Sequence, residues 1–140
     1  MILGYLIVFQ YSHLHLPGAQ HDLEEARCYL EQLGATICYV TDLPQAVEPV
    51  LTVIDLMECL DRTPTNLERV IVYYSGHGEQ DSLVLPNQQL VPFLELRDLI
   101  LERCSPTAQI LFLLDCCYPG SMNLPLVWQD GYRLASPPYQ

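Results

Sequence analysis

The sequence predicts an α/β domain built on a mainly parallel sheet with helices on both of its faces. Short apolar runs rich in β-branched and aromatic residues alternate with segments whose apolar residues recur at helical spacing. This alternation favours parallel strands joined by helical crossovers. The chain has 140 residues, 50% of them hydrophobic, which is enough for one domain with its own core.

The first half of the chain contains two predicted strands and two predicted helices. Residues 3–10 form a continuous apolar run, which is typical of a strand buried on both faces. Residues 22–33 carry apolar side chains at helical spacing, and Gly34 ends that helix. Residues 36–41 are predicted to form the second strand and residues 44–60 the second helix.

The second half continues the same alternation. Residues 69–74 are predicted to form the third strand, and residues 83–91 a small hairpin that turns at Pro86 and Asn87. Residues 93–104 follow as the third helix, and the wholly apolar residues 109–114 as the fourth strand.

The pattern changes near residue 122 and divides the chain in two. Residues 1–122 carry the alternating elements, whereas residues 123–140 are expected to be an irregular proline-rich tail with a weak strand pattern at 124–128. An irregular tail leaves the outer edge of the strand at 109–114 open, and proteins rarely leave an apolar edge bare. We therefore expect this edge to be covered by a separate chain, a second copy of this chain, or the tail itself.

The charge balance excludes two classes of partner. The formal net charge is −11, from 17 acidic residues and six arginines, without any lysine. Nucleic acids and anionic membranes both require basic surfaces, so the sequence argues against either partner. The apolar run at residues 2–9 is too short to span a bilayer and has no basic lead, so we interpret it as a strand.

The cysteines indicate a reducing compartment. Six are present, and no C-x-x-C pair occurs. Cys28, Cys38, Cys59 and Cys104 lie in apolar segments, where a free thiol behaves as a small buried hydrophobe. A domain of this size does not need disulfides for stability. We therefore expect a reduced, cytoplasmic protein that uses no cofactor.

Reactive side chains follow two of the predicted parallel strands. The third strand runs into Ser-Gly-His-Gly at 75–78, and the fourth runs into Asp-Cys-Cys at 115–117. The carboxyl ends of parallel strands meet at one edge of a sheet, where neighbours lie about 5 Å apart. A thiolate attacks a carbonyl only when a base or a positive charge lowers its pKa, and imidazole is the usual base. His77 and one of the two adjacent cysteines are therefore candidates for a catalytic pair.

Glycines flank His77 on both sides, which lets the backbone turn sharply and approach a substrate closely. The N–H groups of Gly78 and Cys117 are candidates for an oxyanion hole. Each such donor contributes roughly 100- to 1000-fold to the rate of acyl transfer.

Three motifs resemble those of a known family. Tyr-Tyr-Ser-Gly-His-Gly-Glu-Gln at 73–80 closely resembles the histidine motif of metacaspases, and Leu-Asp-Cys-Cys at 114–117 resembles their nucleophile motif. Gly-Ala-Gln-His-Asp-Leu at 18–23 is similar to the family's loop-to-first-helix segment. Together they cover residues 1–120, about the large-subunit half of a caspase-type domain. The resemblance implies a caspase-like, Rossmann-like three-layer fold of the metacaspase or orthocaspase type.

The resemblance also implies catalytic roles. His77 would be the general base and Cys117 the nucleophile of a cysteine endopeptidase. The family's nucleophile stands two residues after an Asp, which selects Cys117 over Cys116. Strand alternation agrees, because Asp115 and Cys117 would face one side of the sheet and Cys116 the other.

Asp22, Ser75 and Asp115 resemble the residues that line the family's specificity pocket. Two carboxylates would pair with a guanidinium and repel an Asp side chain, so we expect peptide or protein substrates cleaved after Arg or Lys. A caspase that cleaves after Asp needs arginines in this pocket, and none occurs in residues 1–25. An alternative role for Asp22 is that of a helix N-cap.

Other features favour a pseudoenzyme or regulatory module that binds a peptidase partner through an open sheet edge. Metacaspases usually continue the nucleophile motif as His-Ser-Gly, whereas this chain has Tyr118-Pro119-Gly120, and the proline stiffens the loop. The caspase fold normally adds a small-subunit portion, and only 20 residues follow Gly120. If the chain is an enzyme, we expect a homodimer or a separate small-subunit partner.

Two further interpretations concern ligands. Glu79 and Asp81 are candidate calcium ligands by resemblance, although we favour surface solvation for both. A nucleotide-binding α/β domain is disfavoured, because no glycine-rich phosphate loop follows the first strand.

Overall fold

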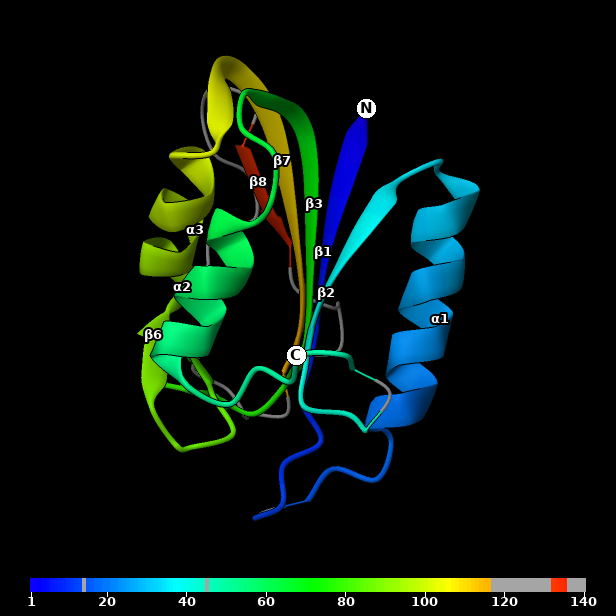
Figure 1. Cartoon of the computed structure of the whole chain (residues 1–140), viewed down its shortest axis with the longest axis vertical. Coiled ribbons are helices and arrows are strands. Elements are labelled where there is room, and N and C mark those ends of the chain that lie inside the picture. The colour runs from blue at the N-terminus through cyan, green and yellow to red at the C-terminus, as the bar shows by residue number, and fades with distance from the viewer. Residues whose placement is uncertain (14, 45, 117–131, 136–140) are drawn as a thin grey trace.

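The computed structural model describes residues 1–13, 15–44, 46–116 and 132–135, with the side chains of Cys116 and of 132–135 excepted. A central sheet stands between helix α1 (Ala19–Gln32) on one face and helices α2 (Val53–Asp61) and α3 (Phe93–Leu101) on the other (Figure 1). The predicted α/β fold with helices on both faces is confirmed.

The central sheet is parallel throughout its described part. It has the order β2-β1-β3-β7-β8, and each neighbouring pair is parallel. Its strands are β1 (Ile2–Val8), β2 (Thr36–Thr41), β3 (Leu67–Gly76), β7 (Cys104–Cys116) and β8 (Tyr132–Ala135).

A small antiparallel sheet follows β3 and contains the predicted hairpin. It has the order β4-β5-β6, with strands β4 (Gly78–Glu79), β5 (Ser82–Val84) and β6 (Leu90–Pro92). Within the described residues, no helix is both long enough and apolar enough to cross a membrane.

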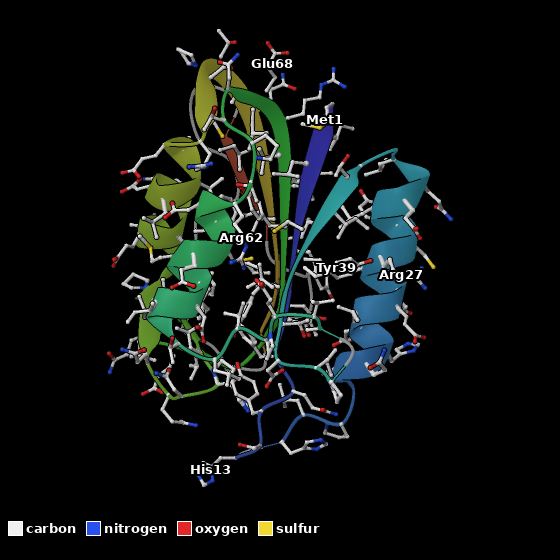
Figure 2. The ribbon with its side chains drawn as sticks, viewed as in Figure 1. Met1, His13, Arg27, Tyr39, Arg62 and Glu68 are labelled. Atoms are coloured by element: carbon white, nitrogen blue, oxygen red, sulfur yellow. The ribbon has the colours of Figure 1, made fainter. Side chains whose placement is uncertain are left out.

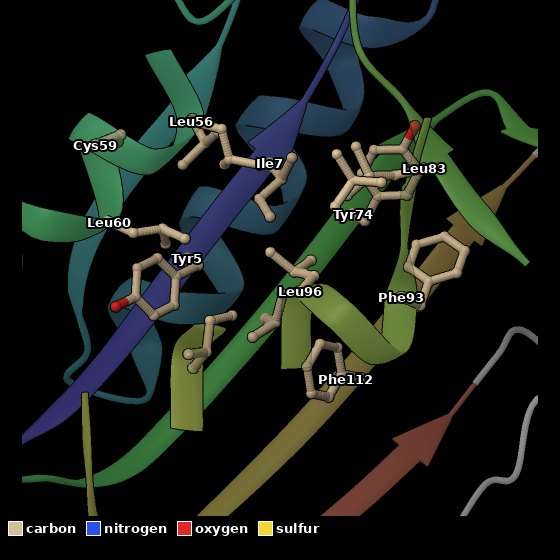
Figure 3. Close-up of a cluster of buried hydrophobic side chains, with 14 of the residues drawn as sticks. Tyr5, Ile7, Leu56, Cys59, Leu60, Tyr74, Leu83, Phe93, Leu96 and Phe112 are labelled. Carbon is tan, nitrogen blue, oxygen red and sulfur yellow. The ribbon is translucent and has the colours of Figure 1, made fainter. Parts of the chain in front are cut away.

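The two faces of the central sheet bury separate apolar clusters. Tyr5 and Ile7 of β1 point into the larger cluster, which α2, α3 and the small sheet complete (Figure 3). Leu6 and Val8 point to the opposite face and pack with α1. Because successive side chains of a strand alternate between faces, a continuous apolar run is needed where both faces are covered. This explains why the first strand has no polar alternation.

The first two of the three predicted helices begin at other residues in the structure, whereas α3 begins at Phe93 as predicted. The second helix was predicted over 44–60, but α2 begins at Val53, where Thr52 and Asp55 form a capping box. That box satisfies the free backbone N–H groups of the first turn and fixes the start of the helix. Helix α1 begins at Ala19 after Gly18, so the proposed N-cap role of Asp22 is wrong.

The expectations for the C-terminal tail and for one cysteine also differ from the structure. Residues 132–135 form β8, so the expectation of an irregular tail is wrong there. This strand pairs with Ile110 to Leu113 of β7, so the chain itself covers part of the edge expected to be open. The weak strand pattern at 124–128 lies outside the described residues.

Cys28 is exposed rather than buried, because α1 turns Ala19, Leu23, Ala26 and Leu30 toward the sheet.

Candidate active site

His77 lies at the joint between the two sheets. It follows the last residue of β3, Gly76, and precedes the first residue of β4, Gly78. The side chain is half-buried. The carboxyl ends of parallel strands gather at this edge, which is where open α/β sheets place their functional groups.

Two tyrosine hydroxyls hold the backbone of His77. The N–H of His77 donates to Tyr11 Oη at 2.9 Å, and its C=O accepts from Tyr74 Oη at 2.5 Å. Tyr11 Oη donates in turn to the carbonyl of Val84 at 2.7 Å, while the Val84 N–H donates to the His77 carbonyl at 3.3 Å. Paired residues of an antiparallel hairpin exchange two backbone hydrogen bonds. Here the hydroxyl of Tyr11 is inserted into one of them.

The two hydroxyls also explain why a glycine, Gly76, must precede His77. A Cβ atom at Gly76 would lie 2.4 Å from Tyr74 Oη and 2.7 Å from Tyr11 Oη. Only glycine leaves that volume free. The ring of Tyr11 additionally packs against the imidazole of His77, with centroids 4.5 Å apart.

Tyr11 is itself fixed by a carboxylate at the end of β2. The backbone N–H groups of Gln10 and Tyr11 donate to the two oxygens of Asp42, at 2.7 and 2.8 Å. Tyr11 has φ = 65°, a left-handed conformation that is uncommon outside glycine. Sequence reasoning missed both residues. The position of Asp42 directly after a predicted strand was the available signal, since polar residues at that edge tend to be functional.

The three predicted pocket residues converge on the α1 side of the sheet. Ser75 Oγ donates to Asp22 Oδ2 at 2.7 Å, although the two residues are 53 apart in the sequence. Asp115 is the register partner of Ser75 on the neighbouring strand β7, so both side chains lie on the same face. Ser75 is 5% exposed and the two aspartates are half-buried.

The structure describes the predicted nucleophile motif only as far as the backbone of Cys116. Cys116 is the register partner of Gly76, which places the end of β7 beside the residue that precedes His77. Cys117, with its predicted roles as nucleophile and oxyanion donor, lies outside the described residues.

The candidate calcium ligands Glu79 and Asp81 are exposed at the β4–β5 turn. Across the residues that the structure describes, no group of three or more His, Cys, Asp or Glu side chains is arranged to hold a metal.

The fold and this edge define an α/β domain of the caspase-like class. Residues 5–133 match the family model of the caspase domain, Peptidase C14, and the chain belongs to this family. The crystal structure of protein GSU0716 from Geobacter sulfurreducens has a similar fold, with a TM-score of 0.61 at 14% sequence identity. The similarity covers 86% of this chain and 52% of that one, so the chain spans about half the length of this neighbour. No curated protein matches the sequence.

Proposed function

We propose that this domain is a cysteine endopeptidase of the metacaspase type that cleaves after Arg or Lys. His77 is the general base, and Cys117 is the nucleophile. The observation that carries the proposal is the convergence of Asp22, Ser75 and Asp115 beside the histidine loop. Membership of the caspase domain family supports the reaction class.

The reaction follows from ordinary thiol chemistry. The imidazole of His77 takes the thiol proton of Cys117, and the thiolate attacks the substrate carbonyl to form a tetrahedral oxyanion. Collapse of this intermediate breaks the peptide bond, and the imidazolium donates its proton to the departing amine. Water, deprotonated by His77, then hydrolyses the thioester and releases the acid.

The backbone after His77 supports an oxyanion hole at Gly78. The bond from the Val84 N–H to the His77 carbonyl makes these two residues a hydrogen-bonded pair of the hairpin. The next pair, Gly78 with Leu83, is then of the alternate kind, whose N–H groups point away from the partner strand. The Gly78 N–H is therefore directed away from β5, as an oxyanion donor at this position would have to be.

The acidic cluster supports selection of a basic side chain. A guanidinium forms paired, charge-assisted hydrogen bonds with carboxylates, and the ammonium of Lys is attracted as a point charge. Ser75 donates to Asp22, which holds one carboxylate in place before substrate arrives. An Asp side chain in the same position would meet two like charges.

Hydrolysis of short fluorogenic peptides ending in Arg, Lys or Asp tests the proposal, with and without calcium. We expect turnover after Arg or Lys, reduced at least about 1000-fold in Cys117→Ala and His77→Ala. Cys116→Ala is the matched control, because it removes the neighbouring thiol and should retain turnover. Cleavage after Asp would contradict the specificity while leaving the catalytic pair intact.

The second candidate function is a pseudoenzyme that binds a peptidase partner. The observation that favours it is Tyr118-Pro119 directly after the nucleophile position. A folded chain without turnover on any of these peptides, in which Tyr118→His with Pro119→Ser restores cleavage, would support this alternative. Absence of turnover in both the chain and this variant would contradict the endopeptidase proposal for the isolated chain.

A further inference from the structure

A cavity separate from the histidine edge opens along β2, the outermost strand on that side of the sheet. It has a volume of about 770 Å³ and is lined by residues of α1, β2, α2 and the loops beside them. Its lining includes Tyr39 of β2, Arg62 and Arg27 of α1 (Figure 2). Neither His77 nor the three pocket residues belong to its lining.

Two thiols face each other in the wall of this cavity. Cys38 on β2 and Cys59 on α2 have their Sγ atoms 3.7 Å apart, and both residues line the cavity. Cys59 is 7% exposed, whereas Cys38 is half-buried. Both are free thiols. At this separation, a small movement of the two side chains brings the sulfurs to bonding distance.

The surroundings favour ionisation of one thiol of the pair. A hydrogen bond from Cys38, together with the guanidinium of Arg62, lowers the pKa of Cys59 to about 7. Glu48 forms an ion pair with Arg62 at 2.6 Å and partly opposes this effect. The same hydrogen bond, together with burial, raises the pKa of Cys38, so the second proton is retained. A thiolate beside a thiol is the arrangement that both peroxide attack and disulfide closure require.

We propose that Cys38 and Cys59 form a peroxide-sensitive dithiol, which closes to a disulfide that joins β2 to α2. The Cys59 thiolate attacks one oxygen of a hydroperoxide; an S–O bond forms, the O–O bond breaks, and the other oxygen leaves as water or alcohol after taking a proton. Cys38 then attacks the sulfenic sulfur. An S–S bond forms, the S–O bond breaks, and the hydroxyl departs as water with the Cys38 proton. Both sulfurs are oxidised and the peroxide is reduced.

The other described thiols lack this combination. Cys104 donates its S–H to the carbonyl of Ile100 at 3.2 Å, and burial raises its pKa. Cys28 is exposed on α1, outside the lining of the cavity. The proposal therefore predicts one specific cross-link, which is independent of the peptidase activity.

Peptide mapping of the peroxide-treated chain identifies that cross-link. The reduced chain is treated with hydrogen peroxide, blocked with N-ethylmaleimide and digested with a protease that cuts after glutamate. Cleavage after Glu31, Glu58 and Glu68 places Cys38 in peptide 32–58 and Cys59 in peptide 59–68, because the bond between Glu48 and Pro49 resists such proteases. Cys28 lies in neither peptide. We expect these two peptides to be joined, with a mass 2 Da below their sum, and to separate on reduction. The midpoint of thermal unfolding should rise by about 5–10 °C on oxidation, because the cross-link closes a loop and so restricts the unfolded chain.

Two variants and one control complete the test. Cys38→Ser should abolish the cross-link and leave Cys59 as a sulfenic acid that dimedone traps, and Cys59→Ser should abolish both products. Cys28→Ser is the matched control and should retain the cross-link. The proposal is overturned if the treated wild-type chain remains folded by circular dichroism while both cysteines carry the maleimide. Joining of either cysteine mainly to another partner would overturn it equally.

Discussion

Tyr11 Oη lies 2.9 Å from the backbone nitrogen of His77 and takes the place of a hairpin hydrogen bond between His77 and Val84. A side chain from the loop after β1 thus sets the backbone of the candidate base. Asp42 fixes that loop from the end of β2. Three strand ends therefore determine the position of one imidazole, a form of positioning on which catalysis depends strongly.

Removal of the Tyr11 hydroxyl should lower both stability and catalytic activity. In Tyr11→Phe, the His77 N–H and the Val84 carbonyl each lose a partner in a largely buried region. We expect the free energy of unfolding to fall by about 1–3 kcal/mol and the turnover of basic peptides to fall by roughly 10-fold or more. Urea unfolding and peptide hydrolysis measure the two effects. Tyr29→Phe, on the exposed side of α1, is the matched control and should change neither quantity.

Gly76→Ala should be more damaging than its size suggests. The new methyl group would lie within 2.7 Å of both tyrosine hydroxyls, which are held by hydrogen bonds and cannot easily move away. We expect a loss of roughly 1–3 kcal/mol in stability, measured by thermal or urea unfolding. At Gly18, where a Cβ would meet nothing within 4 Å, the same substitution should be tolerated. Equal effects at the two sites would contradict the steric explanation.

Ser75→Ala tests the acidic pocket without removing a charge. Asp22 loses the hydroxyl donor at 2.7 Å and is no longer held in one position. We expect kcat/KM for Arg and Lys peptides to fall roughly 10-fold, and about 100-fold in Asp22→Asn, where a carboxylate is also lost. Ser82→Ala is the control, because Ser82 is equally buried but donates to the carbonyl of Gln80. A parallel loss of activity in this control would show that the effect is not specific to the pocket.

The capping box of α2 predicts a pH-dependent contribution to stability. Backbone donors at Leu51 and Thr52 lower the pKa of Asp55, so this carboxylate stabilises the folded state above its unfolded pKa. The contribution is lost as the pH falls through the lower, folded pKa. Asp55→Asn should therefore lower the thermal midpoint at neutral pH, and the difference from wild type should vanish in strong acid. Glu58→Gln on the same helix should show no such convergence.

The order of the main elements and the meeting of the candidate pocket residues at one sheet edge could be predicted from the sequence. Residues 36–41 form a strand with the predicted bounds, because a short β-branched run has few alternatives. Ser75 and Asp115 could be placed together, since both follow parallel strands that end at the same edge.

What could not be predicted depends on contacts between distant segments. The role of Tyr11 requires the exit angle of the loop after β1, which no local pattern encodes. The facing thiols of Cys38 and Cys59 were expected as ordinary buried residues, and only the packing of α2 on β2 brings them together. β8 was missed because its pairing with β7 is long-range and its neighbours are rich in proline.

Strand β8 leads to a prediction about self-association of the chain. The backbone of β8 pairs with Ile110 to Leu113, an apolar stretch whose edge would otherwise be free to pair with another chain. A chain that stops after residue 131 should therefore self-associate, whereas the full chain at the same concentration should show less association. Analytical ultracentrifugation over a range of concentrations measures the difference. A shortened chain that sediments as a clean monomer would show that β8 is not needed to protect the edge of β7.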